Sequence, residues 1–273
     1  MAPTYPLVDG PLARRIEAAT AADVLAWAEC ESARAVYPEA ATLRVSGGVA
    51  AWFCAGNPVN GTFGMGMVGP ATADDVAAVV DFYEARRAPA RIDVSPHADA
   101  SLLPLLAAAG FRVTGFEDVL FQPLPAPPPA PRAASLEVRI AWGEWDRALW
   151  AEIEARGFKD EDVSAADRAL AGSISVRRDG MHFLGMLDGE AAGTGMLVMK
   201  DGVALFNGDA TLPAHRGRGV QSAILAERLR VASEAGCDLA VIEAAPGGTS
   251  HRNQERAGFR IAYTRVSLER PRG

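Results

Sequence analysis

The sequence predicts an α/β (α+β) fold of two domains, each a mixed, mainly antiparallel sheet flanked by helices. Three observations lead there. Residues 183–212 hold three apolar runs separated by Asp188-Gly189 and Asp201-Gly202, and Asp-Gly is typical of tight hairpin turns. Apolar residues recur at helical spacing over 221–235. Six prolines in residues 123–131 form a linker between two halves of the chain.

The second half of the chain is expected to contain both strands and helices. Its first strand is expected at 136–141, and one or two helices follow before His182. Three antiparallel strands, a helix, a strand, a short helix and a final strand come next. We expect them at 183–187, 191–199, 203–212, 221–235, 239–245, 250–257 and 261–268.

A turn rich in glycine and arginine joins the third hairpin strand to the long helix. It reads His-Arg-Gly-Arg-Gly-Val-Gln over residues 215–221. Gly217 and Gly219 let the backbone approach a ligand, and the helix start adds unpaired N–H groups and a positive dipole end. These features predict a phosphate or pyrophosphate site. An ordinary strand-to-helix turn with solvated arginines is the alternative, whereas a P-loop would need Lys and Ser or Thr after its second glycine.

The order of elements and two motifs together resemble the GNAT superfamily of acyl-CoA-dependent N-acyltransferases. The resemblance covers residues 137–273. The family's pyrophosphate motif is matched by Arg216 and Gly219, but its last small residue is replaced by Gln221. The second signature, a short helix that ends in Gly-Phe, is matched up to Gly258-Phe259.

The resemblance implies acetyl-CoA (coenzyme A) as co-substrate. It also implies a slot for pantetheine where the third hairpin strand splays from the strand at 239–245. The cofactor-binding residues are expected on this strand end, on the turn and on the last helix: Ala210, Thr211, Leu212, Arg216, Gly217, Arg218, Gly219, Val220, Gln221, Ser222 and Asn253.

Four residues are candidates for proton transfer. Glu243 is the favoured general base, because a carboxylate inside an apolar strand is costly unless it has partners or a task. It could instead face solvent or pair with an arginine such as Arg252. Asp209 and Asn207 are reserve candidates, and alternation would put both on one face of their strand. Tyr263 is the candidate acid, or a core residue, because Gln254 stands where the family usually has a tyrosine.

The first half resembles a second copy of the same fold. We expect helices at 76–87 and 100–109 around a strand at 91–94, and Gly110-Phe111 precedes Gly258-Phe259 by 148 residues. No arginine corresponds to Arg216 or Arg218 there, so this copy is expected to have lost cofactor binding. The predicted division is a degenerate domain at 1–122, a linker at 123–135 and a catalytic domain at 136–273. Asn60-Gly61 is expected to form a hairpin turn.

Composition and charge narrow the choice of partners and compartment. The formal net charge is −7, which weighs against nucleic acid as the main partner. The three cysteines and four histidines are scattered, so no metal site is expected. Residues 45–73 carry no charge, but their glycines and prolines favour strands over a membrane span. We expect a cytoplasmic monomer or homodimer without a signal peptide.

The predicted function is acetyl transfer from acetyl-CoA to a primary amine of a small molecule or peptide, by direct attack in a ternary complex. A non-catalytic acyl-CoA-binding or regulatory module is the alternative. Several large apolar residues are available to line the acceptor site or to pack in the core: Trp142, Trp145, Trp150, Phe158 and Met181.

Overall fold

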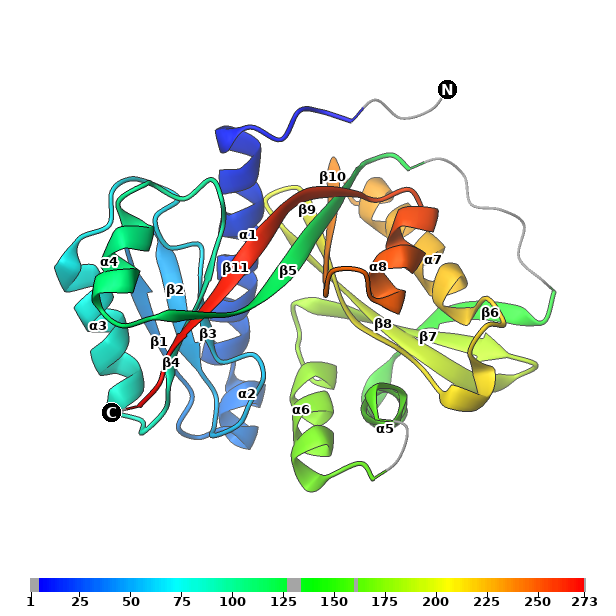
Figure 1. Ribbon diagram of the computed structural model, residues 1–273. Coiled ribbons are helices and arrows are strands. Elements are labelled where there is room, and N and C mark those ends of the chain that lie inside the picture. The colour runs from blue at the N-terminus through cyan, green and yellow to red at the C-terminus, as the bar shows by residue number, and fades with distance from the viewer. Residues whose placement is uncertain (1–4, 127–133, 160–161, 273) are drawn as a thin grey trace. The chain divides into compact units, whose positions relative to one another are not determined.

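The computed structural model describes residues 5–126, 134–159 and 162–272, and these form two compact units (Figure 1). The contiguous unit comprises residues 122–242, with the residues before Leu7, and the composite unit comprises Leu7–Phe121 and Glu243–Gly273. The contiguous unit therefore shares residues 136–242 with the predicted second domain, whereas 243–273 group with the first half. Residues 127–133 of the predicted linker lie outside the described residues.

The contiguous unit contains a mixed sheet with strand order β10-β9-β8-β7-β6. Neighbouring strands are antiparallel except β9 and β10, which are parallel. The strands are β6 (Leu136–Ile140), β7 (Gly180–Leu187), β8 (Glu190–Lys200), β9 (Val203–Thr211) and β10 (Leu239–Ala244). The helices are α5 (Gly143–Phe158), α6 (Ala165–Ser175) and α7 (Val220–Glu234), with a short 3₁₀ turn at Pro213–His215 before α7.

Both predicted Asp-Gly hairpin turns are confirmed. Asp188 and Gly189 have φ of 53° and 83°, and Asp201 and Gly202 have φ of 47° and 77°. Two consecutive positive φ values match the right-handed twist of the flanking strands. The register closes tightly around each turn, since Leu187 pairs with Glu190 and Lys200 with Val203.

Helix α7 packs closely on β7 and β8 because glycines face it. A Cβ built on Gly185 would lie 2.8 Å from both Val220 and Ile224. A Cβ on Gly193 would meet Val220 at 2.8 Å, and one on Gly195 would meet Ile224 at 2.7 Å. The missing side chains thus let two apolar residues of the helix reach the sheet itself.

The composite unit is built around two antiparallel sheets, with strand orders β1-β2-β3 and β4-β11-β5. Its core includes Trp52, Tyr83, Ile92, Leu102 and Leu106, all buried. The strands are β1 (Ala41–Val45), β2 (Gly48–Trp52), β3 (Gly61–Phe63), β4 (Ala90–Val94), β5 (Arg112–Pro123) and β11 (Arg260–Arg270). The helices are α1 (Gly10–Glu29), α2 (Glu31–Val36), α3 (Ala73–Glu84), α4 (Leu102–Ala108) and α8 (Thr249–Arg256).

The predicted elements of the first half are present, but one predicted turn is wrong. Helix α3 begins earlier than expected because Thr72 and Asp75 form a reciprocal capping box. Asn60-Gly61 does not form a two-residue hairpin turn. Asn60 instead holds a longer loop, since its side chain accepts from the Phe53 N–H (2.8 Å) and donates to the Cys54 carbonyl (2.7 Å).

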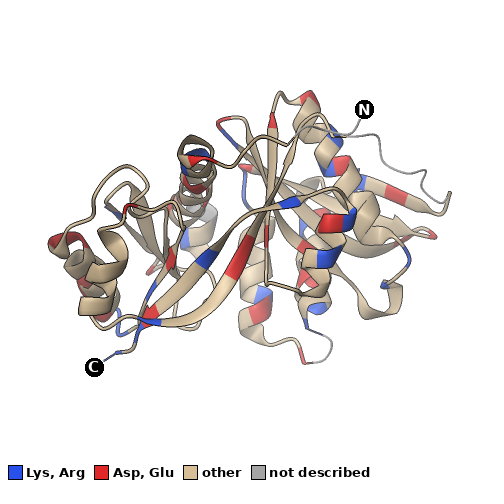
Figure 2. Ribbon diagram, turned by 45° about the horizontal axis from the view of Figure 1, so that its top comes forward, with Lys and Arg blue, Asp and Glu red and all other residues tan. Residues whose placement is uncertain are grey.

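Charged residues of both signs are interspersed over the helices and strands (Figure 2). None of the helices in the described part of the chain has the length and apolar character needed to cross a membrane.

The close approach of α7 gives a stability prediction. Gly185→Ala should lower the free energy of unfolding by about 1–3 kcal/mol, because the new methyl group overpacks the contact with Val220 and Ile224. Gly172→Ala is the matched control, since a Cβ there meets nothing within 4 Å and the residue lies in α6. The control should be neutral or stabilising by about 0.5–1 kcal/mol. Equal denaturation midpoints for both variants would contradict this account.

Candidate functional site

Strand β9 contains a bulge that changes the orientation of the predicted residues. Thr194 pairs with Ala210 and Met196 with Asn207, so β9 carries one more residue than β8 in this interval. Gly208 has φ of 63°, and its carbonyl accepts from the Thr194 hydroxyl at 3.0 Å. An extra residue reverses the alternation of side chains. The prediction that Asn207 and Asp209 share a face is therefore wrong; Asp209 faces α7 and Asn207 the opposite side.

A buried arginine of α7 fills the bulge. One Nη of Arg228 donates to the Met196 carbonyl (3.0 Å), the Asn207 carbonyl (3.3 Å) and Asp209 (3.1 Å). Its other Nη also pairs with Asp209, and the side chain is completely buried. Asp209 would have to give up this ion pair in order to accept a proton. No local sequence signal distinguishes Arg228, because this arginine lies among the charged residues of an amphipathic helix.

The bulge lies where β9 and β10 part. Their parallel pairing runs from Val203–Leu239 to Phe206–Ile242 and then stops, whereas β9 continues to Thr211. Ala210 and Thr211 remain paired with β8, and Leu212 donates to the Ala192 carbonyl at 2.9 Å. The geometry thus provides the expected parting of the two strands within the contiguous unit.

The turn after β9 exposes a row of backbone N–H groups. Gly217 and Gly219 have φ of 73° and 85°, and Gly219 is the N-cap of α7. The first helical hydrogen bond runs from Ala223 to the Gly219 carbonyl at 3.0 Å, so the amides of residues 217–222 precede it. Residues 216–219 are exposed. Such amides at the positive end of a helix form a site for an anion.

The two arginines of the turn differ in their contacts. Arg216 donates to the Thr211 carbonyl (3.3 Å) and to the Gly157 carbonyl of α5 (2.9 Å), so it ties the turn to β9 and α5. Arg218 pairs with Asp188 at 2.8 Å, and both side chains are about half exposed. An exposed ion pair of this kind is weak, which leaves the Arg218 guanidinium able to exchange partners.

Gln221, which departs from the family motif, is bound to β9. Its amide nitrogen donates to Asp209, and its oxygen accepts from the Thr211 hydroxyl at 3.3 Å. The larger side chain therefore fills space toward the bulge. Val220 is buried under the helix, and Ser222 is exposed beside Gln221.

Glu243 and Tyr263 belong to a buried network in the composite unit. Arg265 is fully buried, donates to Glu17 at 2.8 Å and pairs with Glu243. The Tyr263 hydroxyl also donates to Glu17, at 2.8 Å. Burial and the charge of Glu17 raise the pKa of Tyr263 far above its ordinary value, so this phenol holds its proton tightly. The arginine partner of Glu243 is thus Arg265 and not Arg252.

The remaining predicted polar residues lie on α8. Asn253 accepts from Arg256 at 3.0 Å. Gln254 is almost fully buried, and its side-chain oxygen has no hydrogen-bond partner within the described part of the chain.

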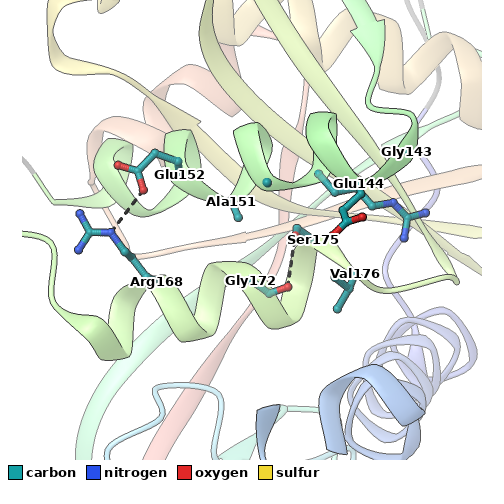
Figure 3. Close-up of a pocket in the computed structure, with 10 residues that line it drawn as sticks. Gly143, Glu144, Ala151, Glu152, Arg168, Gly172, Ser175 and Val176 are labelled. Carbon is teal, nitrogen blue, oxygen red and sulfur yellow. Dashed lines mark hydrogen bonds and ion pairs between the residues drawn. The ribbon is translucent and has the colours of Figure 1, made fainter. Parts of the chain in front are cut away.

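A groove of about 710 Å³ lies between α5 and α6 (Figure 3). Glu144 and Glu152 line it together with Arg147 and Arg168, so it carries both charges in equal number. Glu152 and Arg168 pair across it at 3.3 Å. Of the aromatic residues proposed for an acceptor site, Trp150 is core, whereas Trp142, Trp145 and Phe158 are exposed by 73%, 74% and 63%.

Comparison with known proteins shows similarity to a family of acetyltransferases. Residues 142–259 match the acetyltransferase (GNAT) family, whereas a search of curated proteins gives no match. Two solved structures are similar over almost the whole chain. A GCN5-related N-acetyltransferase from Kribbella flavida has a TM-score of 0.70 and 17% identity, covering 96% of both chains. A tandem GNAT protein from the clavulanic acid biosynthesis pathway has a TM-score of 0.62 and 16% identity, covering 95% of this chain and 97% of that chain.

The buried pair of Arg228 and Asp209 predicts a large effect on stability. Arg228→Met should lower the free energy of unfolding by about 3–5 kcal/mol, because it leaves a carboxylate and two carbonyls without their partner. Arg230→Met is the control on the same helix. Its exposed pairs with Glu227 and Glu234 are worth about 0.3–0.5 kcal/mol each. Similar chemical denaturation curves for the two variants would disprove the role of Arg228.

The acidic residues near Arg265 predict a dependence of stability on pH. Burial, and then the nearby Glu243 and Asp93, raise the pKa of Glu117 to about 7. The raised value favours the protonated form in the folded state, so this stabilisation is full below the ordinary pKa of 4.5 and is lost as pH rises through about 7. Glu117→Gln should therefore raise the melting temperature more at pH 8 than at pH 5. Equal shifts at both pH values would contradict the assignment.

Proposed function

We propose that this chain, whose residues 142–259 match the acetyltransferase (GNAT) family, transfers an acetyl group from acetyl-CoA to a primary amine of a small molecule or peptide. The amine attacks acetyl-CoA directly while both are bound. One observation carries the proposal most strongly. The glycine-arginine turn and the start of α7 lie directly after the strand segment that has parted from β10.

The diphosphate of coenzyme A is assigned to the turn. The amides of Gly217, Gly219 and Gln221 lie in the row that precedes the first helical hydrogen bond, and the helix dipole adds to their attraction for an anion. Arg218 can exchange its weak pair with Asp188 for a phosphate oxygen. Arg216 holds the turn against β9 and α5, so its main role is to keep these amides in place.

Pantetheine is assigned to the free edge of β9. Backbone groups of Ala210, Thr211 and Leu212 follow the last β9–β10 pair and lead into the turn. A backbone N–H on this edge can stabilise the negative charge that develops on the thioester oxygen. Val220, Ser222 and Asn253 complete the proposed set by their resemblance to family positions.

The reaction needs a base, because an amine is protonated at neutral pH. Loss of one proton gives a neutral amine, which forms a C–N bond to the thioester carbonyl carbon. The C–S bond then breaks, and the thiolate takes the second proton from nitrogen. The sequence suggests Glu243 and Asp209 as bases, but each pairs with a buried arginine. Asn207 can only hydrogen-bond the amine or an intervening water.

The ion pairs also favour a second candidate function. A protein that keeps the cofactor turn while its predicted proton carriers serve structural ion pairs could bind acyl-CoA without transferring it. The tightly held proton of Tyr263 points the same way. Release of free thiol from acetyl-CoA, measured over a panel of primary amines, separates the two functions.

Cofactor binding is tested by isothermal titration with coenzyme A. Arg216→Ala should weaken binding about tenfold or more, which corresponds to about 1.4 kcal/mol, because the turn loses both of its braces. Arg218→Ala should weaken it less, since only a direct charge contact is lost. Arg230→Ala is the control, because that exposed arginine pairs within its own helix.

Each result has one interpretation. No binding of coenzyme A by the unchanged protein would overturn both candidate functions. Binding that is insensitive to Arg216 and Arg218 would overturn the assignment of the turn. Tight binding without thiol release on any amine would favour the non-catalytic module.

A further inference from the structure

Helix α5 packs on the bulge of β9 and carries Glu154 on the face that makes this contact. Trp150 and Gly157 both contact this part of the strand. A Cβ on Gly208 would lie 2.7 Å from the Trp150 ring, and a Cβ on Gly157 would lie 2.6 Å from Ala210. Glu154 is four residues after the first contact and three before the second, so it shares their face of the helix.

Glu154 is buried but unpaired. Its residue is only 6% exposed, and no hydrogen bond or ion pair to its carboxyl group occurs among the described residues. A buried carboxylate without a partner is costly. Glu154 differs in this respect from Glu243 and Asp209, each of which has a guanidinium partner.

The surroundings of Glu154 raise the pKa of its carboxyl group. Burial, and then the like charge of Asp167 on α6, raise the pKa of Glu154 to about 7. Lys159 lies 3.9 Å from Asp167 and partly offsets that charge. On β7, burial lowers the pKa of His182 to about 4, so its ring, which packs on Trp150, is neutral at pH 7.

Two further charged groups lie on the neighbouring elements. Arg216, from the turn after β9, donates to the Gly157 carbonyl at the end of α5. Asp209 faces away, toward Arg228 of α7. The guanidinium of Arg216 therefore binds the backbone at the end of α5. The carboxyl group of Glu154 has no ion-pair partner in the part of the chain that the structure describes.

We propose that Glu154 is the general base that takes a proton from the acceptor ammonium at the bulge of β9. This inference rests on the proposed function. The ammonium N–H bond breaks and the proton goes to the Glu154 carboxylate, which leaves a lone pair on nitrogen to attack the thioester carbonyl carbon. The thiolate of coenzyme A leaves with the second proton from nitrogen, and Glu154 returns its own proton to water.

The location distinguishes Glu154 from the other carboxylates. It lies on the helix that covers the strand segment beyond the last β9–β10 pair, where the thioester is assigned. It needs to break no ion pair to accept a proton. A carboxyl group with a pKa near neutral pH is partly ionised at pH 7. Its carboxylate is also basic enough to take a proton from an ammonium group.

The test compares Glu154→Gln with the unchanged protein in a thiol-release assay with acetyl-CoA and an amine that the protein acetylates. We expect kcat to fall about 100-fold or more, whereas the Kd for coenzyme A changes less than about twofold. In the unchanged protein, kcat/KM should rise with pH through about 7, as the carboxylate forms. This rise should be absent in Glu154→Gln.

Two further variants complete the design. Glu234→Gln is the control, since Glu234 is exposed at the end of α7 and pairs with the exposed Arg230; its kcat should be unchanged. Glu154→Asp keeps the carboxyl group but shortens its reach. It should retain the rise with pH at a reduced kcat, and it replaces Glu154→Gln should that variant not fold.

The outcomes separate this inference from the proposed function. Coenzyme A binding without turnover by the unchanged protein would count against the proposed function and remove the inference with it. Turnover that is equal in Glu154→Gln, or a pH profile that is the same in both, would overturn the role of Glu154 alone. Loss of kcat together with the rise near pH 7, with partial recovery in Glu154→Asp, would establish it.

Discussion

The contiguous unit depends on the buried guanidinium of Arg228 in the bulge of β9. The extra residue of a bulge leaves ladder carbonyls without a strand partner, and a buried carbonyl needs one. Arg228 binds two of these carbonyls, and Asp209 balances its charge. Gly195 is part of the same arrangement, because a Cβ there would lie 2.9 Å from the guanidinium carbon. The glycine, the bulge, the acid and the arginine therefore require one another.

The same arrangement fixes the geometry of the cofactor turn. The bulge turns Asp209 toward α7, where Gln221 donates to it. Thr211 then connects the helix start to the strand end, since its hydroxyl binds Gln221 and its carbonyl accepts from Arg216. The replacement of a small residue by Gln221 is thus compensated on the sheet side of the turn. Residues 217–219 themselves stay exposed.

Local signals in the sequence predicted the elements and the turn, whereas long-range polar pairing could not be predicted. Asp188-Gly189, Asp201-Gly202 and the two glycines of the turn have backbone requirements that a few neighbouring residues reveal. The matches to GNAT structures confirm the predicted fold class. The bulge has no local signature, because Gly208 lies within a run that reads as a continuous alternating strand. The pairing of Glu243 with Arg265 joins residues from two separate strands, and no local pattern selects that arginine over Arg252.

The buried acidic residues differ in whether a neighbouring element supplies an arginine partner. Asp209 and Glu243 each pair with a fully buried guanidinium, so both carboxyl groups are part of the structural ion pairs of their units. Glu154 lies on the face of α5 that packs on the bulge, Arg228 pairs with Asp209, and Asp167 of α6 adds a negative charge near Glu154. Burial without a neighbouring cation favours the protonated form of Glu154. The carboxylate therefore accepts a proton readily, and its charged form is stabilised only when a positive charge lies nearby. An ammonium group entering this site would supply that charge at the moment when the proton must be transferred.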